Sequence, residues 1–177
     1  MAGIGANRGK WGFWTDVIYM DLEDDPEDRL GPILTLSNIE LKAWIVTPHV
    51  TYRVAQTKQV SLDLLVGARM LYLKAELEID PLPKSSASDT AWNGIIGVKG
   101  KIDLDKNWFL PFYFDVGTGE TDLTWQAFAA IGYKFSKFDL IAGYRYLEFD
   151  FDDGDTFGGA FNNLIVKGPI IGAKFSF

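Results

Sequence analysis

Hydrophobic and polar residues alternate with a period of two along most of the chain. This spacing is typical of β-strands with one apolar face, and helical periodicity is almost absent. Short and long connections, rich in Asp, Gly, Ser and Pro, separate the alternating segments. The predicted strands are residues 10–22, 38–55, 60–78, 92–104, 108–119, 123–135, 139–151 and 163–177. The order predicts one all-β domain over residues 1–177, an eight-stranded antiparallel up-and-down meander.

Each predicted strand has one nearly apolar face and one face that mixes glycine, charge and an occasional large residue. In the last strand Ile171 and Phe175 share the first face, and Gly172 and Lys174 share the second. A soluble lipocalin-like ligand-binding barrel would turn the apolar faces inward, but eight strands enclose little space. A transmembrane barrel turns them toward lipid and fills its interior with the mixed faces. The amount of large apolar side chain favours the transmembrane β-barrel.

Aromatic residues gather near the strand ends, as they do at the two interfaces of membrane barrels. The predicted girdle beside the short turns consists of Trp11, Phe13, Tyr52, Trp108, Tyr133, Phe135, Phe175 and Phe177. A second set lies toward the long loops: Tyr19, Trp44, Tyr72, Trp125, Tyr144 and Tyr146.

The mixed faces carry charges of both signs. The predicted charge network of the interior is Asp16, Arg53, Asp63, Arg69, Lys99, Lys101, Asp115, Arg145 and Lys174. Charges removed from water need partners, so these acids and bases are expected to pair. Fixed pairs would plug the barrel, and pairs that exchange partners would gate a narrow passage. The small interior of eight strands favours the plug.

Composition narrows the chemistry further. The chain has no cysteine, which excludes disulfides and thiolate metal sites, and its net charge of −7 argues against a nucleic-acid partner. The single histidine, His49, is expected to face inward as a hydrogen-bonded residue rather than a catalytic one. The acidic loops lack the ligand spacing of an EF-hand. We therefore expect no enzyme activity, no metal site and no cofactor. No signal peptide is visible in "MAGIGANRGK", so an exported form would have residues upstream of Met1.

Several stretches resemble a known family. "AAIGYKF", "LIAGYRYLEFDFDDG" and "GPIIGAKFSF", together with "DLLVGARMLYL" and "GIIGVKGKIDLDKNWFLPFYFDVG", are similar to the small Gram-negative outer-membrane β-barrels of OmpA type and OmpW type. The resemblance implies a bacterial outer-membrane location and a C-terminal strand, ending in Phe175 and Phe177, that the barrel insertion machinery recognises.

The resemblance leaves the function open. It implies a structural, envelope or surface-interaction role in contact with the lipid bilayer and lipopolysaccharide. The alternative is a porin-like narrow channel or transporter for small or hydrophobic solutes. We expect a monomer with both termini on the periplasmic side, since an even number of strands returns the chain to its starting side.

Overall fold

All the regular structure in the described part of the chain is β-strand, which confirms the all-β prediction. The computed structural model describes residues 1–24, 28–29, 35–80, 85–151 and 163–175. Among these residues no helix is present that could cross a membrane. The strands are β1 (Ala2–Arg8), β2 (Trp11–Asp24), β3 (Asp28–Arg29), β4 (Thr35–Gln56), β5 (Val60–Asp80), β6 (Ser85–Asp103), β7 (Trp108–Gly119), β8 (Leu123–Lys134), β9 (Asp139–Asp150) and β10 (Asn163–Lys174).

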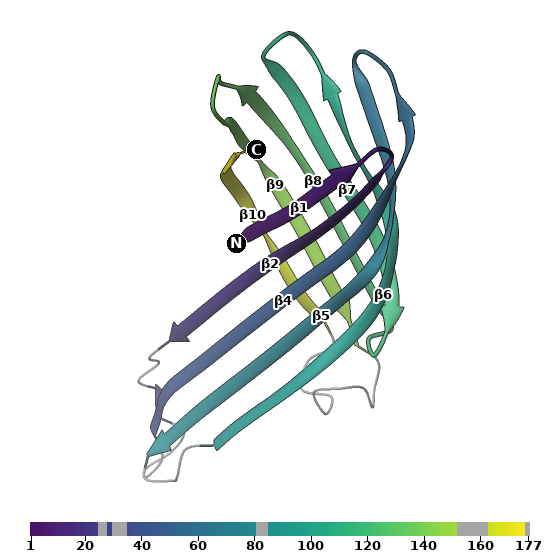
Figure 1. Ribbon diagram of the computed structural model, residues 1–177. Helices are drawn as coiled ribbons and strands as arrows, with labels where there is room; N and C mark the ends of the chain where they lie inside the picture. The colour runs from purple at the N-terminus through teal and green to yellow at the C-terminus, as the bar shows by residue number, and fades with distance from the viewer. Residues whose placement is uncertain (25–27, 30–34, 81–84, 152–162, 176–177) are drawn as a thin grey trace.

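The strands form one curled antiparallel sheet in up-and-down order (Figure 1). Its path is β1-β2-β4-β5-β6-β7-β8-β9-β10, and the two-residue β3 pairs with β4. The up-and-down prediction is therefore confirmed, but the count of eight strands is wrong. Closure is not seen either, because no ladder joins the described parts of β1 and β10. The extra strand β1 was not predicted, because "AGIGANR" consists mostly of small residues and shows no clear alternation of apolar and polar positions.

The path of nine strands also affects the prediction that both termini lie on the same side of the membrane. Ala2 pairs with Val17, partway along β2, whereas Lys174 pairs with Asp139 beside a short turn. The even strand count that was to bring both ends to one side does not hold for the described strands. The periplasmic placement of the termini stays a prediction.

The inward and outward faces of the sheet are those that the alternation predicted. On β4, His49 and Thr51 are buried, whereas Val50 and Tyr52 between and beside them are exposed. On β5, Arg69 is 0% exposed and Val66 is 58% exposed. The mixed faces thus line the inside of the curl, and the apolar faces form its outer surface. This is the reverse of the arrangement in a water-soluble barrel.

Tight turns join the strands at one end of the sheet. Gly9 has a φ of 65° in the β1–β2 turn, a conformation that costs glycine little. In the next turn at this end, the Thr57 hydroxyl accepts hydrogen bonds from the backbone N–H of Gln59 (3.2 Å) and of Val60 (2.9 Å). The β8–β9 turn closes where the N–H of Phe135 donates to the carbonyl of Phe138 at 2.8 Å. We call this the short-turn end, and the opposite end the long-loop end.

Three strands are much longer than the rest. β4, β5 and β6 have 22, 21 and 19 residues, against 12 in each of β7 to β10. Together with β2 they project past the other strands at the long-loop end (Figure 1). We call this projection the wing and define it as residues 20–24, 35–43, 73–80 and 85–91. Parts of it were predicted to be loop, because residues 85–90 are polar; pairing with β5 keeps them extended.

Candidate functional site

The predicted girdle residues that the structure describes lie in a row at the short-turn end, and most of their rings touch in two groups. The ring centroids of Trp11 and Tyr52 lie 4.9 Å apart, and those of Trp108 and Tyr133 also lie 4.9 Å apart. Phe135 follows Tyr133 at 4.8 Å. Phe13 and Phe175 are exposed on the same outer surface, and Phe177 lies outside the described residues. Phe138, which was not predicted, links the row to Phe175 through contacts of 4.9 and 6.0 Å.

The second aromatic set forms a parallel row toward the long-loop end. Tyr19 packs on Trp44 at 4.6 Å, and Trp125 stacks on Tyr146 at 4.7 Å. Tyr72 pairs with Trp44 across the β4–β5 ladder. Tyr144 is exposed but lies between the two rows, because it pairs with Ala129, midway between Trp125 and Tyr133 on β8. Eight positions separate the two rows along each of three strands: Trp11 from Tyr19, Tyr52 from Trp44, and Tyr133 from Trp125. Counted inclusively that is nine residues, the length with which a tilted strand crosses a bilayer core.

The outer surface changes character just beyond the second row. The next outward positions on β2, β4 and β5 are Asp21, Lys42 and Lys74, and these three neighbour one another in the ladders. Lys74 makes an ion pair with Glu76, the following outward residue. The outer surface is therefore apolar between the two aromatic rows, a region we call the band, and charged on the wing.

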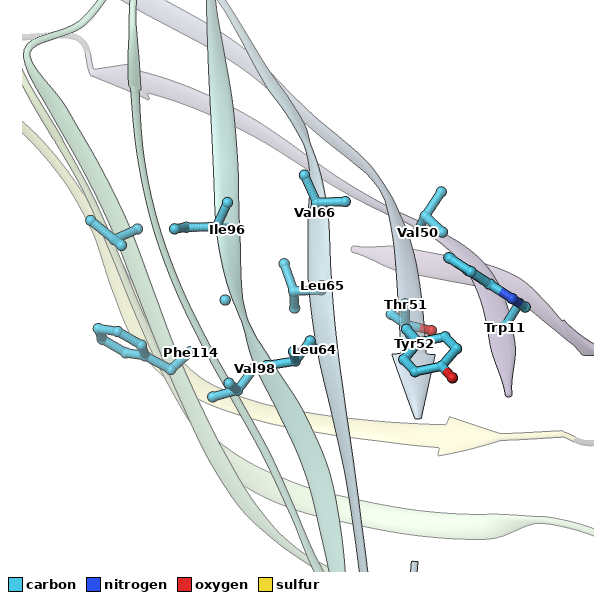
Figure 2. Close-up of a pocket in the computed structure, with 12 residues that line it drawn as sticks. Trp11, Val50, Thr51, Tyr52, Leu64, Leu65, Val66, Ile96, Val98 and Phe114 are labelled. Atoms are coloured by element: carbon cyan, nitrogen blue, oxygen red, sulfur yellow. The ribbon is translucent and has the colours of Figure 1, made fainter. Parts of the chain in front are cut away.

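A hollow of about 660 Å³ lies in the outer surface of the band. Figure 2 shows the side chains around it, which come from β2 and from the four adjacent strands β4 to β7. Most of them are outward apolar residues, among them Trp11, Leu64, Ile96 and Phe114. The hollow offers no charged group, so the molecule it suits is a hydrocarbon chain.

The interior of the band holds one fully buried ion pair. Arg69 Nη2 lies 2.5 Å from Asp115 Oδ2, and both side chains are 0% exposed. Arg69 also donates from Nη1 to the Thr124 hydroxyl at 3.0 Å, and its guanidinium lies 6.0 Å from the centre of the Phe149 ring. Removing either partner would leave an unpaired buried charge. The pair connects β5 to β7 and β8 across the inside of the sheet.

Two further groups of predicted charges meet at the short-turn end. Arg53 forms a two-pronged ion pair with Asp63 on the neighbouring strand, in which Nη2 donates to Oδ2 at 3.1 Å. Lys101 lies 3.2 Å from Asp103, which also binds Lys134 at 2.5 Å. These side chains are partly exposed. Asp103 and Lys134 were not in the predicted network, although both lie on the same mixed faces.

The remaining predicted charges are less well paired. Arg145 lies 3.9 Å from Asp16, and its Nη1 donates to the Met1 sulfur at 3.1 Å. Lys99 places its ammonium 3.9 Å from the centre of the Trp14 ring, a favourable cation–π contact. No ion pair of Lys174 is recorded in the described residues. The structure thus brings eight of the nine predicted charges into pairs or ring contacts.

His49 belongs to a polar region at mid-height of the interior. Its Nδ1 lies 3.2 Å from the carbonyl oxygen of Thr47, and its ring lies 5.8 Å from that of Tyr113. This contact and its burial agree with the expected inward-facing, hydrogen-bonded residue. That it has no catalytic role stays a prediction. Several buried polar atoms here have no hydrogen-bond partner among the described residues: His49 Nε2, Tyr113 Oη, Asp115 Oδ1, Arg69 Nε, Asn93 Nδ2 and Arg145 Nε. Such atoms bind water when the space allows it.

A hydrophobic cluster fills the interior at the long-loop end, and the sequence analysis missed it. Its buried members come from β2, β4, β5 and β9 and from the residue after β9: Ile18, Ala43, Ile45, Leu71, Leu73, Leu147, Phe149 and Phe151. Met20, Leu41, Leu164 and Val166 pack against it. The available signal was that the mixed faces become apolar toward this end, as in Arg69, Leu71 and Leu73 along β5. The cluster closes the inside of the sheet beside the Arg69–Asp115 pair.

The described residues contain no group of three or more His, Asp or Glu side chains arranged to hold a metal ion. Comparisons of the chain with protein families, with curated proteins and with solved structures gave no match. The resemblance to OmpA-type and OmpW-type barrels therefore stays a prediction.

Proposed function

We propose that the protein is an integral outer-membrane β-barrel of a Gram-negative bacterium, with a structural, envelope or surface-interaction role and an interior largely plugged by side chains. The observation that carries the proposal is the inverted polarity of the band. Apolar side chains are exposed on its outside, between two aromatic rows eight positions apart, and a buried ion pair lies on its inside. A water-soluble sheet would bury the apolar face, so this arrangement fits a surface solvated by lipid.

The filled interior favours a structural role over transport. The hydrophobic cluster occupies the interior at the long-loop end, and Arg69 and Asp115 bind each other rather than facing an open path. Transport of polar solutes needs a continuous polar route, which side chains of this kind block.

The wing supports contact with lipopolysaccharide. Its outward charges Asp21, Lys42, Lys74 and Glu76 begin immediately beyond the second aromatic row. At that height a membrane presents phosphate and sugar groups, to which lysine side chains bind as point charges. Both signs are present, so the surface suits a layer of anionic groups bridged by cations.

A narrow channel is the second candidate, and one observation favours it. The unpartnered buried atoms around His49, Tyr113 and Arg145 would be satisfied by a file of water molecules at mid-height. The hydrophobic cluster would then be a closed gate rather than a permanent plug, because hydrophobic constrictions stop conduction by dewetting.

The membrane location is tested with two single-tryptophan variants in vesicles of brominated phosphatidylcholine. Trp44 lies on the outer surface, whereas Trp14 lies inside against Lys99. We expect bromine to quench the fluorescence of Trp44 strongly and that of Trp14 weakly. Equal quenching of both, or a monodisperse protein in buffer without detergent, would overturn the proposal.

Planar-bilayer recording separates the plug from the channel. The wild-type protein is expected to be silent, and the double variant Leu71→Ala, Phe149→Ala is expected to conduct, because it removes the centre of the hydrophobic cluster. Steady discrete currents through the wild type would instead support the channel. The variant Leu64→Ala, Phe114→Ala removes similar groups from the outer surface and serves as the matched control.

A further inference from the structure

We propose that the gap between β1 and β10 is a binding site for one extended polypeptide segment, which completes the barrel as a tenth strand of its wall. The first observation is the direction of the strands. Every ladder along the path is antiparallel, so β1 and β10, separated by eight such steps, run the same way. A direct β1–β10 ladder would be parallel and would break the pattern of the whole sheet.

One strand running the opposite way resolves the mismatch. It would pair antiparallel with β10 on one side and with β1 on the other, and it would bring the wall to an even number of strands, as in bacterial single-chain outer-membrane barrels. Open edges are costly in lipid because their backbone groups find no water. The need for closure rests on the proposed membrane location, whereas the direction of the strand follows from the topology alone.

A second copy of the chain does not fit the gap. In each copy the two free edge strands, β1 and β10, run in the same direction. When two copies are inserted into a membrane the same way, any edge strand of one copy is therefore parallel to any edge strand of the other. Any ladder between the copies would therefore be parallel. The occupant must be a segment that crosses from the short-turn end to the long-loop end.

Empty space inside the gap indicates what this segment carries. A side chain added at Gly132 would collide with the Phe109 ring at 2.3 Å, and one at Gly5 with the Trp14 ring at 2.2 Å. At Gly168 and Gly172, by contrast, a Cβ atom would meet none of the described residues within 4 Å. Gly168 faces inward, because it pairs with the inward residue Arg145, and Gly172 lies on the same face. The inner surface of β10 thus has room for large side chains from a neighbouring strand.

Charge beside the gap points to an acidic side chain. Arg145 pairs in register with Gly168 and is 9% exposed. Its Nε has no hydrogen-bond partner in the part of the chain that the structure describes, and its carboxylate neighbour, Asp16, is 3.9 Å away. Lys174 lies on the same inner face of β10, and the ammonium of Lys99 lies on a ring rather than a carboxylate. A carboxylate opposite Gly168 would reach Arg145 across the glycine.

The occupant is therefore an extended segment of about ten residues. Its outward residues are apolar, and its inward residues include a large side chain opposite Gly172 and, four positions later, an acid opposite Gly168. The probe is a synthetic peptide of this pattern, with Leu and Val outward, Thr inward, and Tyr and Glu at the two specified positions. A second peptide, with Lys in place of Glu, is the control for charge.

Amide hydrogen exchange of the protein in detergent micelles measures the binding. With the Glu peptide at about 100 times its Kd, exchange of amides in residues 2–8 and 163–174 is expected to slow by up to about 100-fold, and the other strands should change little. The Lys peptide should bind about tenfold more weakly or worse. Gly172→Leu fills the space for Tyr and should weaken binding, whereas Gly94→Leu, at an outward glycine on β6, should not.

Several results would overturn the proposal. Slow exchange of both edges before peptide is added would mean that the sheet closes on itself. A dimer in sedimentation, with both edges protected, would make a second copy the occupant. Equal binding of the Glu and Lys peptides on the wild-type protein would remove the argument from charge, even if Gly172→Leu failed to fold. Because binding is measured in micelles, a failure of the membrane location in the brominated-lipid experiment is recognised separately.

Discussion

The band and the wing are built from the same strands, yet their inside and outside are exchanged. In the band, Val66 on β5 is exposed and Arg69 is buried. A few residues later, in the wing, Leu73 is buried and Lys74 faces outward. The wing has the polarity of an ordinary sheet in water, with apolar residues inside. The band has the reverse.

The exchange shows that the alternation of a strand does not by itself say which face is buried. A period of two gives two faces, and the surrounding solvent decides between them. Here the aromatic row of Tyr19, Trp44 and Tyr72 marks the height at which the pattern inverts. Under the proposed membrane location, a single strand that keeps its register across this row passes from lipid into water.

The largest expected effect comes from breaking the ion pair inside the band. Arg69→Met leaves the carboxylate of Asp115 buried without its cation, and the free energy of unfolding should fall by about 3–5 kcal/mol. Urea titration of the protein folded in lipid vesicles measures this loss. The double variant Arg69→Met, Asp115→Leu should recover much of it, because an apolar pair needs no compensation. A loss below about 1 kcal/mol for the single variant would indicate that water reaches the pair, as in the channel alternative.

A second effect comes from the hydrophobic cluster where the wing joins the band. Leu71→Ala leaves a cavity among packed side chains and should lower the free energy of unfolding by about 2–5 kcal/mol. The matched variant Leu64→Ala shortens the same residue type on the outside of the same strand, where lipid can close the space, so its loss should be clearly smaller. Equal losses in the urea titration would mean that the outside of the band is packed against protein.

How much of the fold could be predicted from the sequence depends on what each residue touches. Strands β7 to β10 were located to within about one residue at most boundaries, because their alternation is undisturbed and short turns separate β7, β8 and β9. Residues 85–91 of the wing were predicted to be loop because residues such as Ser86 and Ser88 have no strand preference of their own. They are extended because β5 pairs with them.

The candidate site was predictable in outline but not in its pairing. The nine charges lie on mixed faces, which the period of two identifies. Which partner each charge takes depends on the curl: Arg69 bonds Asp115 two strands away, while Arg53 bonds Asp63 on the adjacent strand. The hydrophobic cluster was missed because each strand contributes only one or two buried residues to it, and these become one cluster only when the sheet curls.

A third effect compares a new charge on the two outer surfaces. Val66→Arg puts a cation in the middle of the band and should cost about 2–4 kcal/mol of unfolding free energy in vesicles, as at the midplane of membrane barrels. Ser88→Arg puts the same cation on the outside of the wing, where Ser88 pairs with Lys74, and should change stability by no more than about 0.5 kcal/mol. Similar costs at both positions would contradict the assignment of the inversion to a change of solvent.

The smallest effect concerns the ion pair of the wing. The hydrogen bond from Lys74 to Glu76 raises the pKa of the Lys74 ammonium above its ordinary value of 10.5. Because this pKa is higher in the folded state, any stability from the pair is complete at neutral pH and is lost only as the pH rises through the raised pKa. Salt should screen such an exposed pair, so NMR titration in high salt should return the pKa toward 10.5. Lys74→Gln should leave the urea midpoint unchanged at neutral pH, in contrast to Arg69→Met. If the midpoint fell comparably in both variants, the wing would be as dry as the interior of the band, and the two regions would no longer differ in solvent.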